Sequence, residues 1–211
     1  KLKQFIFTDV HHSSPKALSI TNQTEAGTIY NEDETSQLCS VAKKYNISTH
    51  LDGARFANAL IATKKTPAEL TWKSGIDVMS FGGTKNGTVC TEYVIFFNKK
   101  IGKKANFYQK KFGQLFSKQR FISAQYLAYF KNNLWLKNAN SANKMAKYFY
   151  KELSKTHKYL FLFKVQGNEI FIKLNNKEVN ILKTKDVKFH IAGKTANNLN
   201  IVRFVVSYCN R

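Results

Sequence analysis

The sequence predicts an α/β fold, with a mostly parallel sheet wrapped by helices, followed by a smaller α+β unit. Two observations support this prediction. Short apolar runs alternate with stretches of helical periodicity in residues 1–115, and from residue 116 two long helical stretches are followed by several strand-like runs. The chain has 211 residues, 43% of them hydrophobic, which is enough for one large core or two small ones. We therefore expect two tightly packed units, residues 1–115 and 116–211.

The first unit is expected to alternate strands with helices. Four apolar runs are expected to be strands: 17–21, 47–51, 78–81 and 93–97. Three stretches are expected to be helices: 33–45, 53–62 and 68–74. Asn31 and Glu34 have the spacing of a capping box before the first helix, and Pro67 suits the opening of the last one. This order of elements is typical of a parallel or mixed sheet covered by helices.

The second unit is expected to begin with helices and continue with strands. Two long helices are expected: 117–132 and 136–154. The strands are expected at four places: 160–165, 169–174, 187–191 and 200–206. No Pro- or Gly-rich linker separates the two units, so they should pack against each other.

The net charge of +21 raises the possibility of nucleic-acid binding, for which a clustered basic surface is typical. The lysines, however, occur as scattered pairs across several predicted elements. The chain has no arginine-rich arm, no RNA-recognition signature and no zinc-ligand spacing. We therefore expect no nucleic-acid partner, and a basic nucleic-acid-binding protein remains the alternative interpretation of the charge.

Apolar runs and cysteines bear on location and on metal binding. No run approaches the roughly 20 apolar residues that cross a bilayer, so no membrane partner is expected and the cytoplasm is the default location. The three cysteines, Cys39, Cys90 and Cys209, fit neither a disulfide framework nor a metal site. We expect them to be reduced, buried and structural, and we expect no metal ligands.

Two polar segments follow predicted strands. The segment His50-Leu51-Asp52-Gly53-Ala54-Arg55 ends the strand at 47–51, and Ser80-Phe81-Gly82-Gly83-Thr84-Lys85-Asn86-Gly87 ends the strand at 78–81. An acid, Asp52, and a lysine, Lys85, are thus expected at the carboxyl ends of two strands of one open sheet, where such sheets bind ligands. His50 is expected to point to the opposite face of its strand, away from this site.

At these segments the chain resembles the low-specificity threonine aldolases. This family belongs to the β-eliminating lyase group of the aspartate aminotransferase-like, fold type I pyridoxal phosphate (PLP) enzymes. The resemblance extends to four further segments: 18–21, 114–121, 134–139 and 202–205. It implies part of a PLP-dependent transferase-like large domain, with a smaller α+β domain after it. Compared with the family, the N-terminal stretch that holds the cofactor phosphate and the C-terminal helix are expected to be absent.

The resemblance implies a role for six residues. Lys85 would form the Schiff base with PLP, and its amine must be unprotonated, which requires burial or nearby cations to lower its pKa. Asp52 would hold the proton on the pyridine nitrogen. Arg55 would reach the phenolic oxygen of the cofactor or a carboxylate, and Arg203 would clamp the α-carboxylate of the substrate. Lys118 would lie near phosphate or substrate. Some relatives carry a histidine in the turn where this chain has Glu25, so either Glu25 takes over the handling of the β-hydroxyl proton or that role is absent.

Each of these residues also has a simpler interpretation. Lys85 and Lys118 could be solvated surface charges. Asp52 could cap the helix that follows it, and Arg55 could pair with a surface acid. Arg203 lies in an apolar strand, where an unpaired charge costs several kcal/mol, so it requires an anion of some kind.

The resemblance implies PLP-dependent cleavage of L-threonine or L-allo-threonine to glycine and acetaldehyde. The implied ligand is a small β-hydroxy amino acid, and the implied assembly is a homodimer or homotetramer. Two alternatives stay open within the same fold: a related PLP-dependent β-eliminating lyase and an inactive remnant of such an enzyme.

Overall fold

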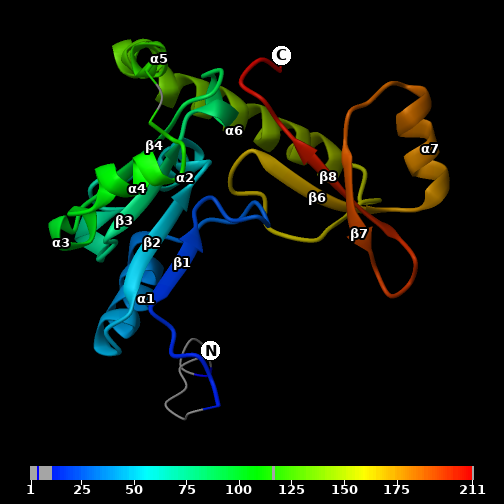
Figure 1. The fold of residues 1–211 in the computed structure, drawn as a ribbon. Helices are drawn as coiled ribbons and strands as arrows, with labels where there is room; N and C mark the ends of the chain where they lie inside the picture. Colours follow the sequence, from blue (N-terminus) through cyan, green and yellow to red (C-terminus); the bar gives the residue numbers. More distant parts are fainter. Residues whose placement is uncertain (1–3, 5–10, 116, 211) are drawn as a thin grey trace.

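Two sheets joined by a long helix make up the part of the chain that the computed structural model describes, residues 4, 11–115 and 117–210. The helix, α6 (Leu134–Ser154), runs from the first sheet to the second (Figure 1). Its amino-terminal end contributes Trp135 and Leu136 to the first hydrophobic core. Further along, Met145 and Phe149 belong to the second core. The helix is therefore shared by both halves of the fold.

The first sheet has the strand order β1-β2-β3-β4 and is mostly parallel. Its strands are β1 (Ala17–Thr21), β2 (Ser48–Gly53), β3 (Val78–Gly82) and β4 (Glu92–Phe96). The first three run parallel, and β4 pairs antiparallel with β3. All four predicted strands are present with shifts of one or two residues at their ends, and the predicted α/β class is confirmed.

Helices and short 3₁₀ turns connect these strands. The helices of this part are α1 (Glu32–Lys44), α2 (Phe56–Thr63), α3 (Lys99–Gly102), α4 (Ala105–Lys111) and α5 (Gln119–Phe130). The 3₁₀ turns are η2 (Trp72–Ser74), η3 (Thr84–Asn86) and η4 (Lys131–Asn133). Helix α2 begins three residues later than predicted because β2 continues through Gly53. The short helices α3 and α4 were not predicted.

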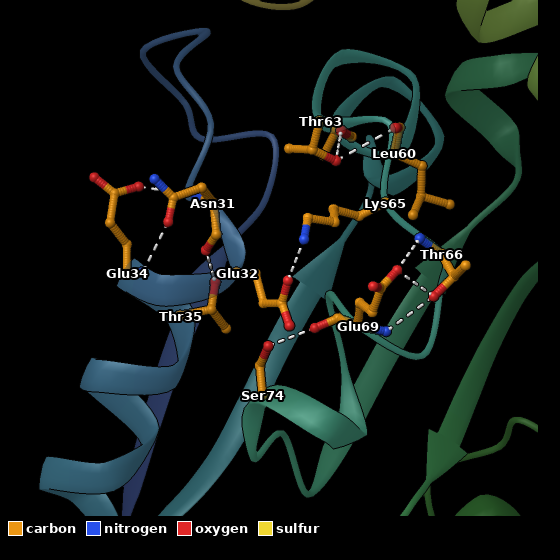
Figure 2. Close-up of polar contacts among 11 residues, drawn as sticks. Asn31, Glu32, Glu34, Thr35, Leu60, Thr63, Lys65, Thr66, Glu69 and Ser74 are labelled. Carbon is orange, nitrogen blue, oxygen red and sulfur yellow. Dashed lines mark hydrogen bonds and ion pairs between the residues drawn. The ribbon is translucent and has the colours of Figure 1, made fainter.

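Local side-chain bonds explain how the helical segments begin (Figure 2). The predicted capping box is present: the Asn31 side chain accepts from the Glu34 backbone N–H, and the Glu34 carboxylate accepts from the Asn31 N–H, both at 2.9 Å. Lys65, just after α2, pairs with Glu32 at the start of α1. Thr66 and Glu69 bond reciprocally at the next turn.

The helix predicted over 68–74 is wrong. This segment forms a turn followed by η2. Its hydroxyl groups donate hydrogen bonds to backbone carbonyl oxygens. Thr71 Oγ1 donates to the Pro67 oxygen at 2.6 Å, and Ser74 Oγ donates to the Glu69 oxygen. Such local side-chain bonds give the backbone an alternative to a continuous α-helix.

The second sheet is antiparallel, with the order β5-β6-β8-β7. Its strands are β5 (Leu160–Phe161), β6 (Glu169–Leu174), β7 (His190–Lys194) and β8 (Asn200–Val205). Strand β5 is shorter than predicted, and β7 lies three residues further along the chain and has an irregular register between Ile191 and Gly193. The helix α7 (Asn176–Thr184) was missed, although Asn175 and Glu178 form a capping box at its start.

The boundary expected between residues 115 and 116 stays a prediction, and Phe116 itself lies outside the described residues. Residues beyond that boundary complete the first core, because Tyr126 and Tyr129 of α5 are buried there with residues such as Leu51 and Phe81. The second core instead lies between the β6–β8 pair, α6 and α7.

The three cysteines are free thiols, as predicted, but their burial differs from the prediction. Only Cys39 is buried, whereas Cys90 and Cys209 are exposed. Burial raises the pKa of the Cys39 thiol to about 11, which keeps it in the unreactive protonated form. A search of the helices in the described ranges finds none with the length and apolar character needed to cross a bilayer.

Candidate active site

Asp52 and Lys85 follow neighbouring parallel strands, so both lie at the same edge of the first sheet. Asp52 is the fifth residue of β2 and pairs in register with Ser80 of β3, and Lys85 lies in η3, just after β3. The end of β3 touches the turn after β2. A Cβ atom on Gly82 would be only 2.8 Å from the Cα atom of Ala54, so the absence of a side chain permits this close approach.

One oxygen of Asp52 is already used by the protein. Its Oδ1 accepts a hydrogen bond from the Ala54 backbone N–H at 3.0 Å. This bond stabilises the turn rather than the helix, since α2 begins only at Phe56 and has no side-chain cap. Among the described residues, no hydrogen-bond partner is found for the other oxygen, Oδ2. The half-buried carboxylate therefore keeps an acceptor for a ligand that donates an N–H.

His50 shares the face of β2 that carries Asp52, so its predicted orientation is wrong. Residues two apart in a strand point to the same side. The His50 ring joins three strands on this face: Nδ1 lies 2.8 Å from Ser19 Oγ on β1, and Nε2 lies 2.9 Å from Ser80 Oγ on β3. The face beside Asp52 is thus a hydrogen-bonded polar row, whereas the opposite face carries core residues such as Leu51.

The Lys85 side chain is exposed, so of the two surroundings expected for its amine, burial or nearby cations, burial is not found. Its neighbour Asn86 is buried and fixes the loop. The Asn86 side-chain amide donates to the Tyr129 hydroxyl on α5 and to the Trp135 backbone oxygen on α6 at 2.8 Å. Asn138 of α6 donates in return to the Asn86 backbone oxygen at 2.9 Å. Helices α5 and α6 therefore determine where Lys85 is presented.

Replacement of Asn86 by alanine is expected to lower the free energy of unfolding by about 1–3 kcal/mol, because the buried Tyr129 hydroxyl and Trp135 carbonyl lose their donor. Urea denaturation of the variant and the wild-type chain measures the difference. The matched control is Asn180→Ala, an exposed asparagine within helix α7. A loss in Asn86→Ala no larger than in the control would contradict this role.

A buried acid on the second sheet holds the two arginines of the predicted site. Glu169 Oε1 lies 3.0 Å from an Arg55 guanidinium nitrogen and 3.6 Å from Nη1 of Arg203. The other oxygen, Oε2, accepts from the Gln23 side-chain amide at 3.0 Å. Arg55 was expected to reach the phenolic oxygen of the cofactor or a carboxylate, with a surface acid as the simpler alternative, and its carboxylate partner here is the fully buried Glu169. Arg203 has the anion that its apolar strand requires.

Glu169 was not singled out from the sequence, although the same reasoning that selected Arg203 applies to it. It is a charged residue in the otherwise apolar strand Glu169-Ile170-Phe171-Ile172. Burial raises its pKa above the usual value of 4.5, and this effect outweighs the opposing influence of Arg55, the Gln23 hydrogen bond and Arg203.

The other two predicted site residues, Glu25 and Lys118, are both exposed. Glu25 is exposed in the loop between β1 and α1, and its charge acts on Glu169. Gly27 of the same loop has φ +74°, and a Cβ there would lie 3.0 Å from the Glu169 backbone oxygen. Lys118 is exposed just before α5, and no contact joins it to the other predicted site residues in the described part of the chain.

The largely parallel sheet, with an acid and a lysine at the carboxyl ends of adjacent strands and a smaller antiparallel sheet beside it, defines a PLP-dependent transferase-like α/β protein. Residues 1–177 match the family model described as "Beta-eliminating lyase". The chain belongs to the β-eliminating lyase family, whose enzymes depend on pyridoxal phosphate.

Comparison with known proteins gives the same family. The chain is 37% identical over 182 residues to the low-specificity L-threonine aldolase of Pseudomonas sp. (strain NCIMB 10558) and 34% identical to that of Pseudomonas aeruginosa. Each alignment covers 86% of this chain and 53% of the relative, so the chain spans about half the length of these enzymes. The solved threonine aldolase of Leishmania major is 25% identical, with a TM-score of 0.89, over 97% of this chain and 59% of that one.

Proposed function

We propose that the chain binds PLP through Lys85 and contributes to the cleavage of L-threonine or L-allo-threonine into glycine and acetaldehyde. The observation that supports this proposal is the position of Asp52 and Lys85 at the carboxyl ends of adjacent parallel strands, with the end of β3 at Gly82 in contact with the turn after β2. The Pseudomonas relatives, named as low-specificity L-threonine aldolases, indicate the substrate class.

The residues present fit this cofactor. The exposed Lys85 amine is accessible to an aldehyde, and Asp52 Oδ2 has an acceptor position left for the protonated ring nitrogen. When bound, PLP supplies an electron sink that allows the Cα–Cβ bond of the substrate to break. Arg203 would orient the substrate by its carboxylate, and Glu25 would receive the β-hydroxyl proton. Arg55 and Lys118 would supply positive charge for the cofactor and the substrate.

The test is covalent labelling of the purified chain with PLP. Absorbance is followed during titration, the product is reduced with borohydride, and the labelled peptide is identified by mass spectrometry. We expect the label on Lys85 and its loss in Lys85→Ala, while the exposed Lys103→Ala serves as a matched control that keeps it. Labelling that is unchanged in Lys85→Ala would contradict the proposal.

Activity is then measured as acetaldehyde released from L-threonine and L-allo-threonine. Release identifies an aldolase, pyruvate or ammonia from other amino acids identifies another β-eliminating lyase, and labelling without turnover identifies an inactive remnant. Light scattering on the same sample measures the homodimer or homotetramer that we propose. Exposed apolar side chains on α4 and α5, among them Phe107 and Leu127, support an assembly of this kind.

A further inference from the structure

The Glu169 carboxylate lies on the face of the second sheet that is turned away from the second core. Ile170 and Ile172 of β6 belong to that core, and Glu169, by alternation, points to the other side. Arg203 of β8 is opposite Phe171 in the register, so it shares this face with Glu169. The loop after β1 and the turn after β2 supply Gln23 and Arg55 to the same place. Two arginines thus converge on one internal carboxylate.

The two arginines are held unequally. Arg55 is 8% exposed and lies 3.0 Å from Glu169, whereas Arg203 is 28% exposed and lies 3.6 Å away. In addition, the Nε atom of Arg203 is buried and forms no hydrogen bond within the described residues, and the same is true of Glu169 Oε1. Arg203 is therefore the arginine whose hydrogen-bonding capacity is incompletely used and whose guanidinium is partly open to solvent.

We propose that Glu169 is an internal competitor for the carboxylate-binding position of Arg203. Its carboxylate lies where it can satisfy the guanidinium in the free chain, and the carboxylate of an incoming amino acid binds Arg203 at the expense of this contact. The inference rests on the proposed function, in which Arg203 binds the substrate carboxylate. It adds a residue that weakens the binding of carboxylate ligands and leaves amines without a carboxylate unaffected.

The opposite role for Glu169 makes the opposite prediction. If Glu169 only positions Arg203 for the ligand, its removal would misplace the guanidinium and weaken binding. If it competes, its neutralisation frees Arg203 and strengthens binding. The direction of the change in affinity therefore distinguishes the two roles, and loss of stability alone cannot imitate the gain in affinity that competition predicts.

The experiment measures L-threonine binding to the PLP-free chain by calorimetry at constant ionic strength. Glu169→Gln is expected to bind L-threonine about tenfold more tightly than wild type, the factor expected when Arg203 regains a charge-assisted hydrogen bond to a ligand. L-Threoninol, which has the amine and hydroxyl but no carboxylate, is expected to bind both chains equally. Unchanged or weaker L-threonine binding by the variant would overturn the inference.

Two further variants control for charge and for the receiving residue. Glu178→Gln removes the same charge from a surface ion pair with Lys158 on the same sheet unit and is expected to leave L-threonine binding unchanged. Adding Arg203→Gln to Glu169→Gln is expected to abolish the gain in L-threonine affinity. A gain that also appears in Glu178→Gln, or that survives without Arg203, counts against the inference.

A third variant covers the case in which Glu169→Gln does not fold. Glu169→Asp keeps the negative charge in place but withdraws the carboxylate from both arginines by one methylene group, and it should show a smaller gain in L-threonine affinity than Glu169→Gln. Failure of the PLP labelling at Lys85 would refute the proposed cofactor and leave this measurement standing. An absent gain with intact labelling would refute the competitor alone.

Discussion

Replacement of Arg55 by methionine is expected to lower the free energy of unfolding by roughly 3–5 kcal/mol, because it leaves the Glu169 carboxylate buried without its nearer partner. The Glu169 side chain has no exposure to solvent that could compensate for the loss. Arg203, at 3.6 Å, replaces only part of the interaction. Urea denaturation near pH 7, with the midpoint and slope compared between variant and wild type, measures the effect.

The double variant Arg55→Met with Glu169→Met is the matched control for this prediction. Removing both charges takes away the uncompensated carboxylate, and Arg203 is exposed enough to be hydrated, so most of the lost stability should return. If the double variant is no more stable than Arg55→Met, the loss arises from packing rather than from the carboxylate.

The pH dependence provides a second check on the same variant. Glu169 is faced by Arg55, Arg203 and Glu25 as charged groups and by Gln23 as a neutral one. Because its pKa is raised in the folded chain, its contribution to stability is complete below the usual value of 4.5 and is lost as the pH rises through the raised pKa. Loss of Arg55 raises this pKa further. The destabilisation in Arg55→Met should therefore be smaller at about pH 5 than at about pH 8.

Replacement of Phe81 by alanine is expected to cost about 3–5 kcal/mol of unfolding free energy, the range for a fully packed aromatic residue. The ring is 4% exposed. It contacts five aromatic rings from helices α2, α5 and α6: Phe56, Tyr126, Tyr129, Phe130 and Trp135. The Phe81 backbone oxygen also accepts a hydrogen bond from the Tyr126 hydroxyl at 2.8 Å, so a cavity here loosens the packing of α5 on the end of β3.

The control for Phe81→Ala is Val94→Ala on the adjacent strand. Val94 is 60% exposed, so its truncation should change stability by no more than about 0.5 kcal/mol. Since Phe81 precedes the loop that carries Lys85, PLP labelling of Phe81→Ala should also fall under conditions where the variant is still folded. Equal stability losses in the two variants would show that the aromatic cluster does not anchor β3.

The positions of Asp52 and Lys85 could be predicted because each depends on local pattern alone. An apolar run identifies a buried strand, and parallel strands place the residues that follow them at one edge. The Glu169 contacts with Arg55 and Gln23 could not be predicted in this way. They join loops of the first sheet to a strand of the second, and local periodicity does not indicate which residues far apart in the sequence meet in the fold. The error at His50 had a different origin, since the two-residue spacing from Asp52 already indicates a shared face.

Short elements were the other source of error. Helix α7 lies outside the predicted elements although its capping residues are visible in the sequence. The periodicity of residues 68–74 predicts a helix, whereas the hydroxyl bonds of Thr71 and Ser74 favour a turn there. In both places side-chain to backbone hydrogen bonds decided the outcome, and hydrophobic periodicity is insensitive to them.

The sharing of α6 between the two cores has a consequence for cooperativity. Trp135 and Leu136 pack in one core, and Met145 and Phe149 pack in the other, so unwinding the whole helix removes apolar contacts from both halves. Loss of this helix therefore destabilises both sheets together. The described chain should therefore unfold in a single thermal transition, with the two sheets losing structure at the same temperature.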